Sequence, residues 1–316
     1  MTSTSIATTY QKRESDLVKL QGLIPPAITP LRPDGAVDTA AVHRLTDHLV
    51  AGGADGIFIL GTSGEGPSLT RMKRQQVAAE FVRAAARRVP VLAGAAETSA
   101  ERGEEAIDDL SEAGVDVVVL NTPYHLAGVG DRAVLAHLQR LAGYSSLPTV
   151  IYNIPVNTNN PVSPTVLDDV ASMPGVIGLK DSSDDWDSFE SMLRVGHRHG
   201  IAVLQGSERL VARSVLAGAD GAVPGIANLV PALAARLIAA SRAGDESSAM
   251  AMQARFDAVC ALQTSGFWLA CLKAAASRLQ LCTPTLASSM PGLTDAEAAR
   301  LEGFLATVER EARTHE

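Results

Sequence analysis

The chain has 316 residues, of which 46% are hydrophobic and 20% are charged, and its formal net charge at pH 7 is −8. This composition is typical of a globular protein with ample material for a core, and the length suits one large domain or two. The negative charge argues against nucleic acid as the main partner, and no apolar run is long enough to span a membrane.

Residues 1–21 are polar and mixed in charge, without the apolar stretch of a signal peptide. We therefore expect a poorly ordered tail on a cytoplasmic protein. The three cysteines, Cys260, Cys271 and Cys282, lie among apolar residues and lack metal-ligand spacing. We expect them to act as small hydrophobic side chains in a reducing compartment, and we expect neither a metal nor a cofactor.

From residue 23 onward, short apolar or β-branched runs alternate with longer amphipathic segments. The expected strands are residues 23–28, 56–60, 91–94, 115–120, 149–152, 176–179, 202–204 and 221–223. Most of these runs are continuously apolar rather than alternating, which is typical of parallel strands covered on both faces.

The segments between the runs carry helix signals. Val42, Leu45 and Leu49 keep a helical spacing, residues 98–101 form a Thr-x-x-Glu capping box, and residues 163–164 place a serine cap before a first-turn proline. A Gly-x-Asp repeat begins at Gly53, Gly114 and Gly218, each time between an expected helix and the next strand. We expect these glycines to terminate the helices.

Eight strand–helix units predict a (β/α)8 barrel over residues 22–244, with a doubly wound α/β sheet as the weaker alternative. After residue 244 the strand pattern stops. Residues 245–316 are therefore expected to form a helical extension appended to the barrel.

The carboxyl ends of barrel strands normally hold the active site. The second expected strand ends in Gly-Thr-Ser-Gly-Glu-Gly at residues 61–66. Backbone N–H groups and the hydroxyls of Thr62 and Ser63 could bind a carboxylate there, although such a segment is also a common turn. The glycine spacing fits neither a phosphate-binding loop nor a dinucleotide site.

Lys180 ends the sixth expected strand, in a chain with only five lysines among its 27 basic residues. A desolvated lysine can attack a carbonyl, which arginine cannot, although a lysine at a strand end can also simply reach to solvent. Tyr152 ends the fifth expected strand. It could carry protons for a substrate on a neighbouring strand, or it could be an ordinary core tyrosine. An amine, a phenol and a carboxylate site together suit a 2-oxo acid.

Three motifs now carry a family resemblance: Gly-Thr-Ser-Gly-Glu at 61–65, Tyr-Asn-Ile-Pro at 152–155 and Gly-Leu-Lys-Asp-Ser-Ser at 178–183. In this order and spacing they resemble the dihydrodipicolinate synthase / N-acetylneuraminate lyase family, from about residue 23 to the C-terminus. The resemblance implies a Schiff-base enzyme on a (β/α)8 barrel, usually a homotetramer built as a dimer of dimers.

The same resemblance implies a role for each matching residue. Lys180 forms the imine, Tyr152 relays protons together with Thr62, and Thr62 and Ser63 hold the substrate carboxylate. Gly206 and Val223 lie beside the imine.

Two departures weaken the match to the synthase itself. Asn157 stands where the synthases carry an arginine for the second substrate's carboxylate. His125 stands where they carry the second of two tyrosines, which enters a neighbouring subunit's proton relay. His125 either replaces that relay group or packs at a subunit contact.

Residues 157–158 and 180–182 are more similar to aldolases of 2-keto-3-deoxy sugar acids and of 4-hydroxy-2-oxoglutarate. In the 4-hydroxy-2-oxoglutarate aldolases the residue matching Ser182 contacts substrate. Lys273, a rival lysine, is expected to lie outside the barrel and to pack or reach solvent.

The expected function is that of a Schiff-base lyase or aldolase that makes or breaks a carbon–carbon bond in a pyruvate-type 2-oxo acid. Two alternatives use the same imine: a 4-hydroxy-tetrahydrodipicolinate synthase, and a dehydratase or deaminase of the family. A third, from another class, is a non-catalytic protein that binds 2-oxo acids.

Overall fold

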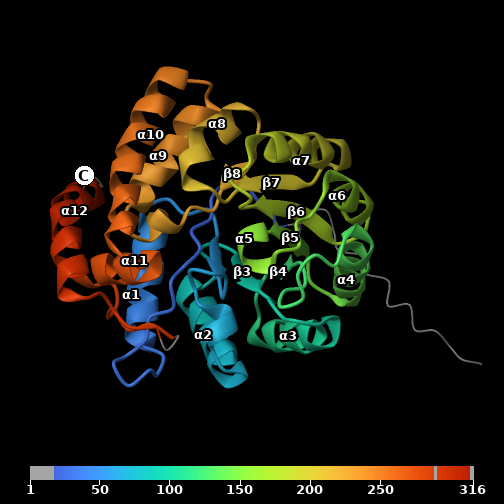
Figure 1. Ribbon diagram of the computed structural model, residues 1–316, viewed down its shortest axis with the longest axis horizontal. Helices are drawn as coiled ribbons and strands as arrows, with labels where there is room; N and C mark the ends of the chain where they lie inside the picture. Colours follow the sequence, from blue (N-terminus) through green and yellow to red (C-terminus); the bar gives the residue numbers. More distant parts are fainter. Residues whose placement is uncertain (1–17, 288–289, 314–316) are drawn as a thin grey trace, which may run out of the picture.

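The computed structural model describes residues 18–287 and 290–313; most of the expected N-terminal tail, residues 1–17, lies outside the described residues. Eight parallel strands form one sheet surrounded by helices (Figure 1). The strands are β1 (Gly22–Leu23), β2 (Ile57–Ile59), β3 (Val91–Gly94), β4 (Val117–Asn121), β5 (Thr149–Asn153), β6 (Val176–Asp181), β7 (Ala202–Gln205) and β8 (Gly221–Ala222). From β2 to β8 each strand pairs with the next in chain order, and β8 pairs with β1.

The sheet closes between β1 and β2. Phe58 donates its backbone N–H to the Pro25 carbonyl at 3.0 Å, and Ala27 donates to the Phe58 carbonyl at 2.8 Å. Prolines at 25 and 26 have no N–H to give to a ladder, so β1 is shorter than the expected run 23–28. The predicted barrel is confirmed, and the doubly wound sheet is wrong.

Helices follow the strands and surround the barrel (Figure 1). They are α1 (Thr39–Ala51), α2 (Arg71–Ala85), α3 (Ala100–Ala113), α4 (Asp131–Tyr144), α5 (Pro155–Thr158), α6 (Pro164–Ala171), α7 (Trp186–His199), α8 (Val211–Leu216) and α9 (Pro231–Arg242). Beyond the barrel come α10 (Glu246–Cys260), α11 (Trp268–Arg278) and α12 (Asp295–Arg313). These last three confirm the expected C-terminal helices; α10 packs on α8 and α9, and α12 packs on α9 to α11.

Most helix signals are confirmed. Val42, Leu45 and Leu49 are buried on α1, and the Ser163 hydroxyl accepts the Val166 N–H at the start of α6. The capping box is wrong by one residue: Ser99, not Thr98, caps α3, and its hydroxyl accepts the N–H of Arg102.

The Gly-x-Asp repeat joins neighbouring strands. Its glycines adopt the left-handed conformation that ends a helix, with φ between 82° and 102°. Its aspartates then accept a backbone N–H from the preceding strand: Asp55 from Leu23 at 2.9 Å, and Asp116 and Asp220 from the first halves of β3 and β7 at 2.8 Å. The repeat therefore ties three pairs of adjacent strands together at their amino ends.

The barrel interior is packed with side chains. Its cluster includes Leu20, Phe58, Val119, Tyr152 and Val223. A second apolar layer lies between the strands and the helices. Since the interior is filled, open space for a ligand remains at the carboxyl ends of the strands.

Within residues 18–287 and 290–313 no single helix is long and apolar enough to cross a membrane. One sharply bent pair of helices, 246–265 with 268–278, is long and apolar enough by length and composition alone.

Candidate active site

Lys180 lies near the carboxyl end of β6 with only 5% of its surface exposed. It is in register with Tyr152 of β5, and its Nζ lies 4.0 Å from the centroid of the Tyr152 ring and 4.8 Å from that of Phe58. The two rings meet edge to face. The amine is thus held between aromatic side chains, shielded from bulk water, so the reading of Lys180 as a lysine that reaches solvent is wrong.

The next residue along each strand points away from the barrel interior, because side chains alternate along a strand. Asp181 is 1% exposed and accepts hydrogen bonds from Asn153 Nδ2 at 2.7 Å, from the Ser183 N–H at 2.9 Å and from the Ser183 hydroxyl at 2.6 Å. Burial raises the pKa of the Asp181 carboxyl, against the effect of these bonds. Asn153 Oδ1 in turn accepts the Val162 N–H. This pair joins β5 and β6 directly behind Tyr152 and Lys180, and the sequence analysis missed it.

The loop 61–66 is a tight turn made possible by its glycines. A Cβ on Gly66 would lie 2.0 Å from the Leu60 carbonyl oxygen, and one on Gly61 would lie 2.6 Å from the Phe58 ring. Thr62 is half-buried, and its Oγ1 accepts a hydrogen bond from Asn157 Nδ2 at 3.3 Å. That bond leaves the Thr62 hydroxyl proton available to another acceptor.

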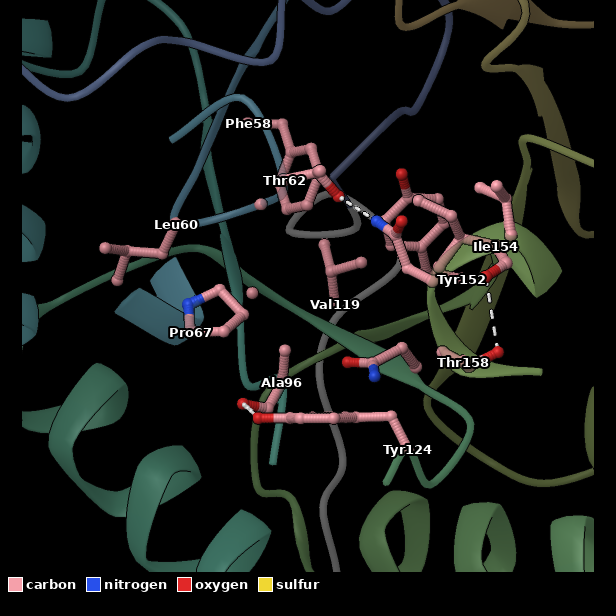
Figure 2. A pocket seen from close by; sticks show the side chains of 15 residues that line it. Phe58, Leu60, Thr62, Pro67, Ala96, Val119, Tyr124, Tyr152, Ile154 and Thr158 are labelled. Carbon is pink, nitrogen blue, oxygen red and sulfur yellow. Dashed lines mark hydrogen bonds between the residues drawn. The ribbon is translucent and has the colours of Figure 1, made fainter. Parts of the chain in front are cut away.

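A cavity of about 390 Å³ opens beside this loop, at the ends of β2 to β5. It contains three predicted site residues, Thr62, Tyr152 and Asn157, and its wall includes Phe58 (Figure 2). Among the described residues that line it, none carries a formal charge. The other lining residues are Leu60, Gly61, Pro67, Gly94, Ala96, Val119, Asn121, Tyr124, Ile154, Val156 and Thr158. Lys180 is not among the residues that line this cavity, but its Nζ lies next to the rings of Tyr152 and Phe58, which are.

Tyr124 lines the cavity across from Thr62, and its hydroxyl contacts the Ala96 carbonyl oxygen at 3.5 Å (Figure 2). Burial, and then the nearby Glu97 carboxylate, raise the pKa of the Tyr124 phenol. His125 is exposed, has a φ of 79° and does not line the cavity. Within this chain, Tyr124 rather than His125 therefore lines the cavity. Tyr124 and Asn121, which ends β4, were missed although they follow an expected strand.

The remaining candidates lie at the ends of β6 to β8, apart from Ser63, which belongs to the loop after β2. The Ser182 hydroxyl lies beside Gly206, where an added Cβ would be only 2.0 Å away, and the Gly206 N–H donates to the Asp181 carbonyl at 2.6 Å. Ser63 is 7% exposed and faces Gly225, and Val223 packs in the barrel interior with Tyr152. None of these residues lines the cavity of Figure 2.

The described part of the chain holds no group of three or more histidine, cysteine, aspartate or glutamate side chains arranged to bind a metal ion. The chemistry available on this face is that of one buried amine, phenol and threonine hydroxyls, and amides. An amine with neighbouring hydroxyls can form an imine with a carbonyl and move protons around it.

Comparisons with known proteins agree with this geometry. A model of the dihydrodipicolinate synthetase family matches residues 19–306. The chain is 30% identical to a 4-hydroxy-tetrahydrodipicolinate synthase of Ruegeria pomeroyi, over 90% of this chain and 97% of that protein. It is 32% identical to the putative 2-dehydro-3-deoxy-D-gluconate aldolase YagE of Escherichia coli, over 72% of this chain and 76% of YagE.

Solved structures give the same result. The dihydrodipicolinate synthase of Bacteroides thetaiotaomicron superposes with a TM-score of 0.87 at 32% identity, covering 92% of this chain and 99% of that one. YagE in complex with pyruvate superposes with a TM-score of 0.86 at 27% identity, covering 92% and 98%. The family model covers nearly the whole chain, and the barrel with its C-terminal helices is shared throughout. The chain therefore belongs to the dihydrodipicolinate synthetase family.

Proposed function

We propose that this protein is a Schiff-base lyase that cleaves or forms a carbon–carbon bond in a 2-keto-3-deoxy sugar acid. The observation that carries the proposal is the Lys180 amine, held against the Tyr152 ring beside a cavity without charged side chains. The likeness to YagE, a putative 2-dehydro-3-deoxy-D-gluconate aldolase whose structure contains pyruvate, supports it.

In the proposed reaction, the Lys180 amine attacks the C2 carbonyl of the 2-oxo acid, and the resulting carbinolamine loses water to form an imine. Tyr152 gives its phenol proton to the hydroxyl that leaves the carbinolamine, and in the cleavage direction the oxygen that has lost this proton removes the proton of the C4 hydroxyl. The C3–C4 bond then breaks, releasing an aldehyde and leaving its electron pair in an enamine. Protonation of C3 and hydrolysis release pyruvate and restore the amine. Thr62 passes protons between Tyr152 and the substrate, and Thr62 and Ser63 bind the carboxylate.

The absence of charge along the described cavity lining supports an uncharged aldehyde half. A second carboxylate would find no cationic side chain on this lining, whereas hydroxyls find donors and acceptors on Thr62, Asn121, Tyr124 and Asn157. Both 4-hydroxy-2-oxoglutarate and aspartate semialdehyde bring a second carboxylate. A sugar acid chain brings hydroxyls, and is the substrate class that this lining suits best.

A second candidate function is the condensation performed by 4-hydroxy-tetrahydrodipicolinate synthases, because proteins of that name are about as similar to this chain as YagE is. Asn157 argues against this function, because a neutral amide cannot form the two charge-assisted hydrogen bonds that an arginine makes with a carboxylate.

We also propose that the protein is a homotetramer, as its resemblance implies, with the exposed segment at His125 in a subunit contact. Light scattering measures the mass of the assembly. A monomer would remove the subunit-contact role of His125 and leave the Lys180 chemistry unaffected.

The test of the proposed function is reduction with borohydride in the presence of pyruvate, followed by peptide mass analysis. We expect pyruvate to be attached at Lys180 and not at Lys273, and we expect no labelling in Lys180→Met. Pyruvate release from a panel of 2-oxo acids then separates an enzyme from a binding protein. Labelling elsewhere, or a panel without turnover, would contradict the proposal.

A further inference from the structure

Lys273 lies in α11, one of the helices that follow the barrel, and its side chain is 0% exposed. Its Nζ lies 2.5 Å from Glu65 Oε1 and donates a second hydrogen bond to the Thr285 carbonyl oxygen at 2.6 Å. The ammonium group is therefore fully enclosed. Lys273 packs inside the protein instead of reaching solvent.

Glu65 is only 3% exposed and belongs to the loop 61–66 that carries Thr62 and Ser63. Its second carboxylate oxygen accepts the backbone N–H of Ala287 at 2.7 Å. One ion pair thus joins three parts of the chain: the loop after β2, helix α11 and the segment 285–287. Because both charges are shielded from water, each depends strongly on the other.

The loop transmits the position of Glu65 to its neighbours. Glu65 has a φ of 55°, in the left-handed region that favours glycine, so its backbone is strained and its contacts must offset that strain. Its N–H donates to the Thr62 carbonyl at 3.1 Å, and the preceding Gly64 carbonyl accepts the Thr29 hydroxyl at 2.6 Å. A shift of Glu65 therefore moves Thr62 and Ser63.

We propose that Lys273 is a positioning residue: by pairing with Glu65 it holds Thr62 and Ser63 where they bind the carboxylate of the 2-oxo acid. The C-terminal helices are then part of the active site. The identity of the ligand rests on the proposed function, whereas the effect on the loop does not.

The first measurement is hydrogen–deuterium exchange in Lys273→Met. We expect residues 61–66 to exchange faster than in the wild type, while β6 keeps its protection. Lys73→Met is the matched control, because the Lys73 ammonium group donates to the Gly35 carbonyl at 2.7 Å and lies outside the site. Unchanged exchange in the loop, or an equal increase throughout the barrel, would overturn the proposal.

The second measurement is the pyruvate concentration that gives half-maximal borohydride trapping. We expect it to rise about tenfold in Lys273→Met, the effect of weakening one hydrogen bond to a carboxylate, with the maximal extent of trapping unchanged. If Lys273 only stabilised the fold, the substitution would instead lower the maximal extent of trapping, in proportion to the fraction of the protein that is unfolded.

The double variant Glu65→Gln/Lys273→Met separates stability from position. It leaves no unpaired buried charge, so we expect it to fold even where Lys273→Met does not. The link to α11 is still missing, so fast loop exchange and the raised pyruvate requirement should persist; wild-type values in this variant would overturn the proposal. If the wild type itself fails to trap pyruvate, the proposed function is wrong and loop exchange alone decides the inference.

Discussion

Replacing Asn157 with arginine should change substrate preference from hydroxylated to carboxylate-bearing substrates. Asn157 is exposed at the cavity, which leaves room for a longer side chain, and its Nδ2 donates a hydrogen bond to the Thr62 hydroxyl at 3.3 Å. A guanidinium there would give a second carboxylate a charge-assisted fork worth about 1.5–3 kcal/mol, or about 10- to 150-fold in binding. Because the position is exposed, solvent screening places the expected gain near the tenfold end.

The assay is pyruvate release from 4-hydroxy-2-oxoglutarate and from 2-keto-3-deoxygluconate, compared as a ratio of kcat/KM. Asn157→Met is the matched control, since it also removes the bond to Thr62 but adds no charge. We expect the ratio to rise in Asn157→Arg relative to Asn157→Met by about tenfold at low ionic strength and to fall back as salt is added. Equal ratios in the two variants would refute the idea that the uncharged lining determines the substrate class.

Three further predictions follow from contacts within the site and core. Tyr152→Phe should lower turnover about 10²- to 10⁴-fold, while it keeps the fold and the aromatic ring against which Lys180 packs. A rate near wild type in steady-state kinetics would mean that another group carries the proton. Asn153→Ala should reduce the free energy of unfolding, measured in urea, by roughly 2–6 kcal/mol, because the Asp181 carboxylate and the Val162 N–H each lose a buried hydrogen-bond partner. A loss below about 1 kcal/mol would show that water replaces the amide. Burial raises the pKa of the Cys282 thiol to about 11 and also raises the pKa of the buried Cys271, so iodoacetamide at pH 8 should label these two cysteines only after unfolding. Rapid labelling of either in the native protein would contradict their burial.

The barrel could be predicted because each of its strands is an apolar run followed by helix signals of its own. The Gly-x-Asp repeat even marked three helix ends correctly. Strand lengths were harder to predict, because β1 is ended by two prolines whose effect depends on which neighbour they face. The cap of α3 was misplaced because Thr98 and Ser99 are both good cap residues, and only the backbone geometry distinguishes them.

The site was predictable only where a single residue carries unusual chemistry. Lys180 stood out because the chain uses so few lysines, and Tyr152 because it ends the neighbouring strand. Asn121 and Tyr124 are common residue types at a strand end, and nothing in a sequence says which side chains share a cavity. The ion pair of Glu65 and Lys273 joins residues 208 positions apart, a contact that no local pattern could have revealed.

Consecutive residues of β5 and β6 point to opposite faces of the barrel wall, and the two faces have different roles. Tyr152 and Lys180 face inward and carry the proposed chemistry, while Asn153 and Asp181 face outward and bond to each other. Because a slip of one residue would exchange the two faces, the buried outward pair that stabilises the sheet also determines which side chains meet inside it. The precision of the lysine–tyrosine contact therefore depends on a polar pair that never touches the substrate, so its loss should affect imine formation as well as stability.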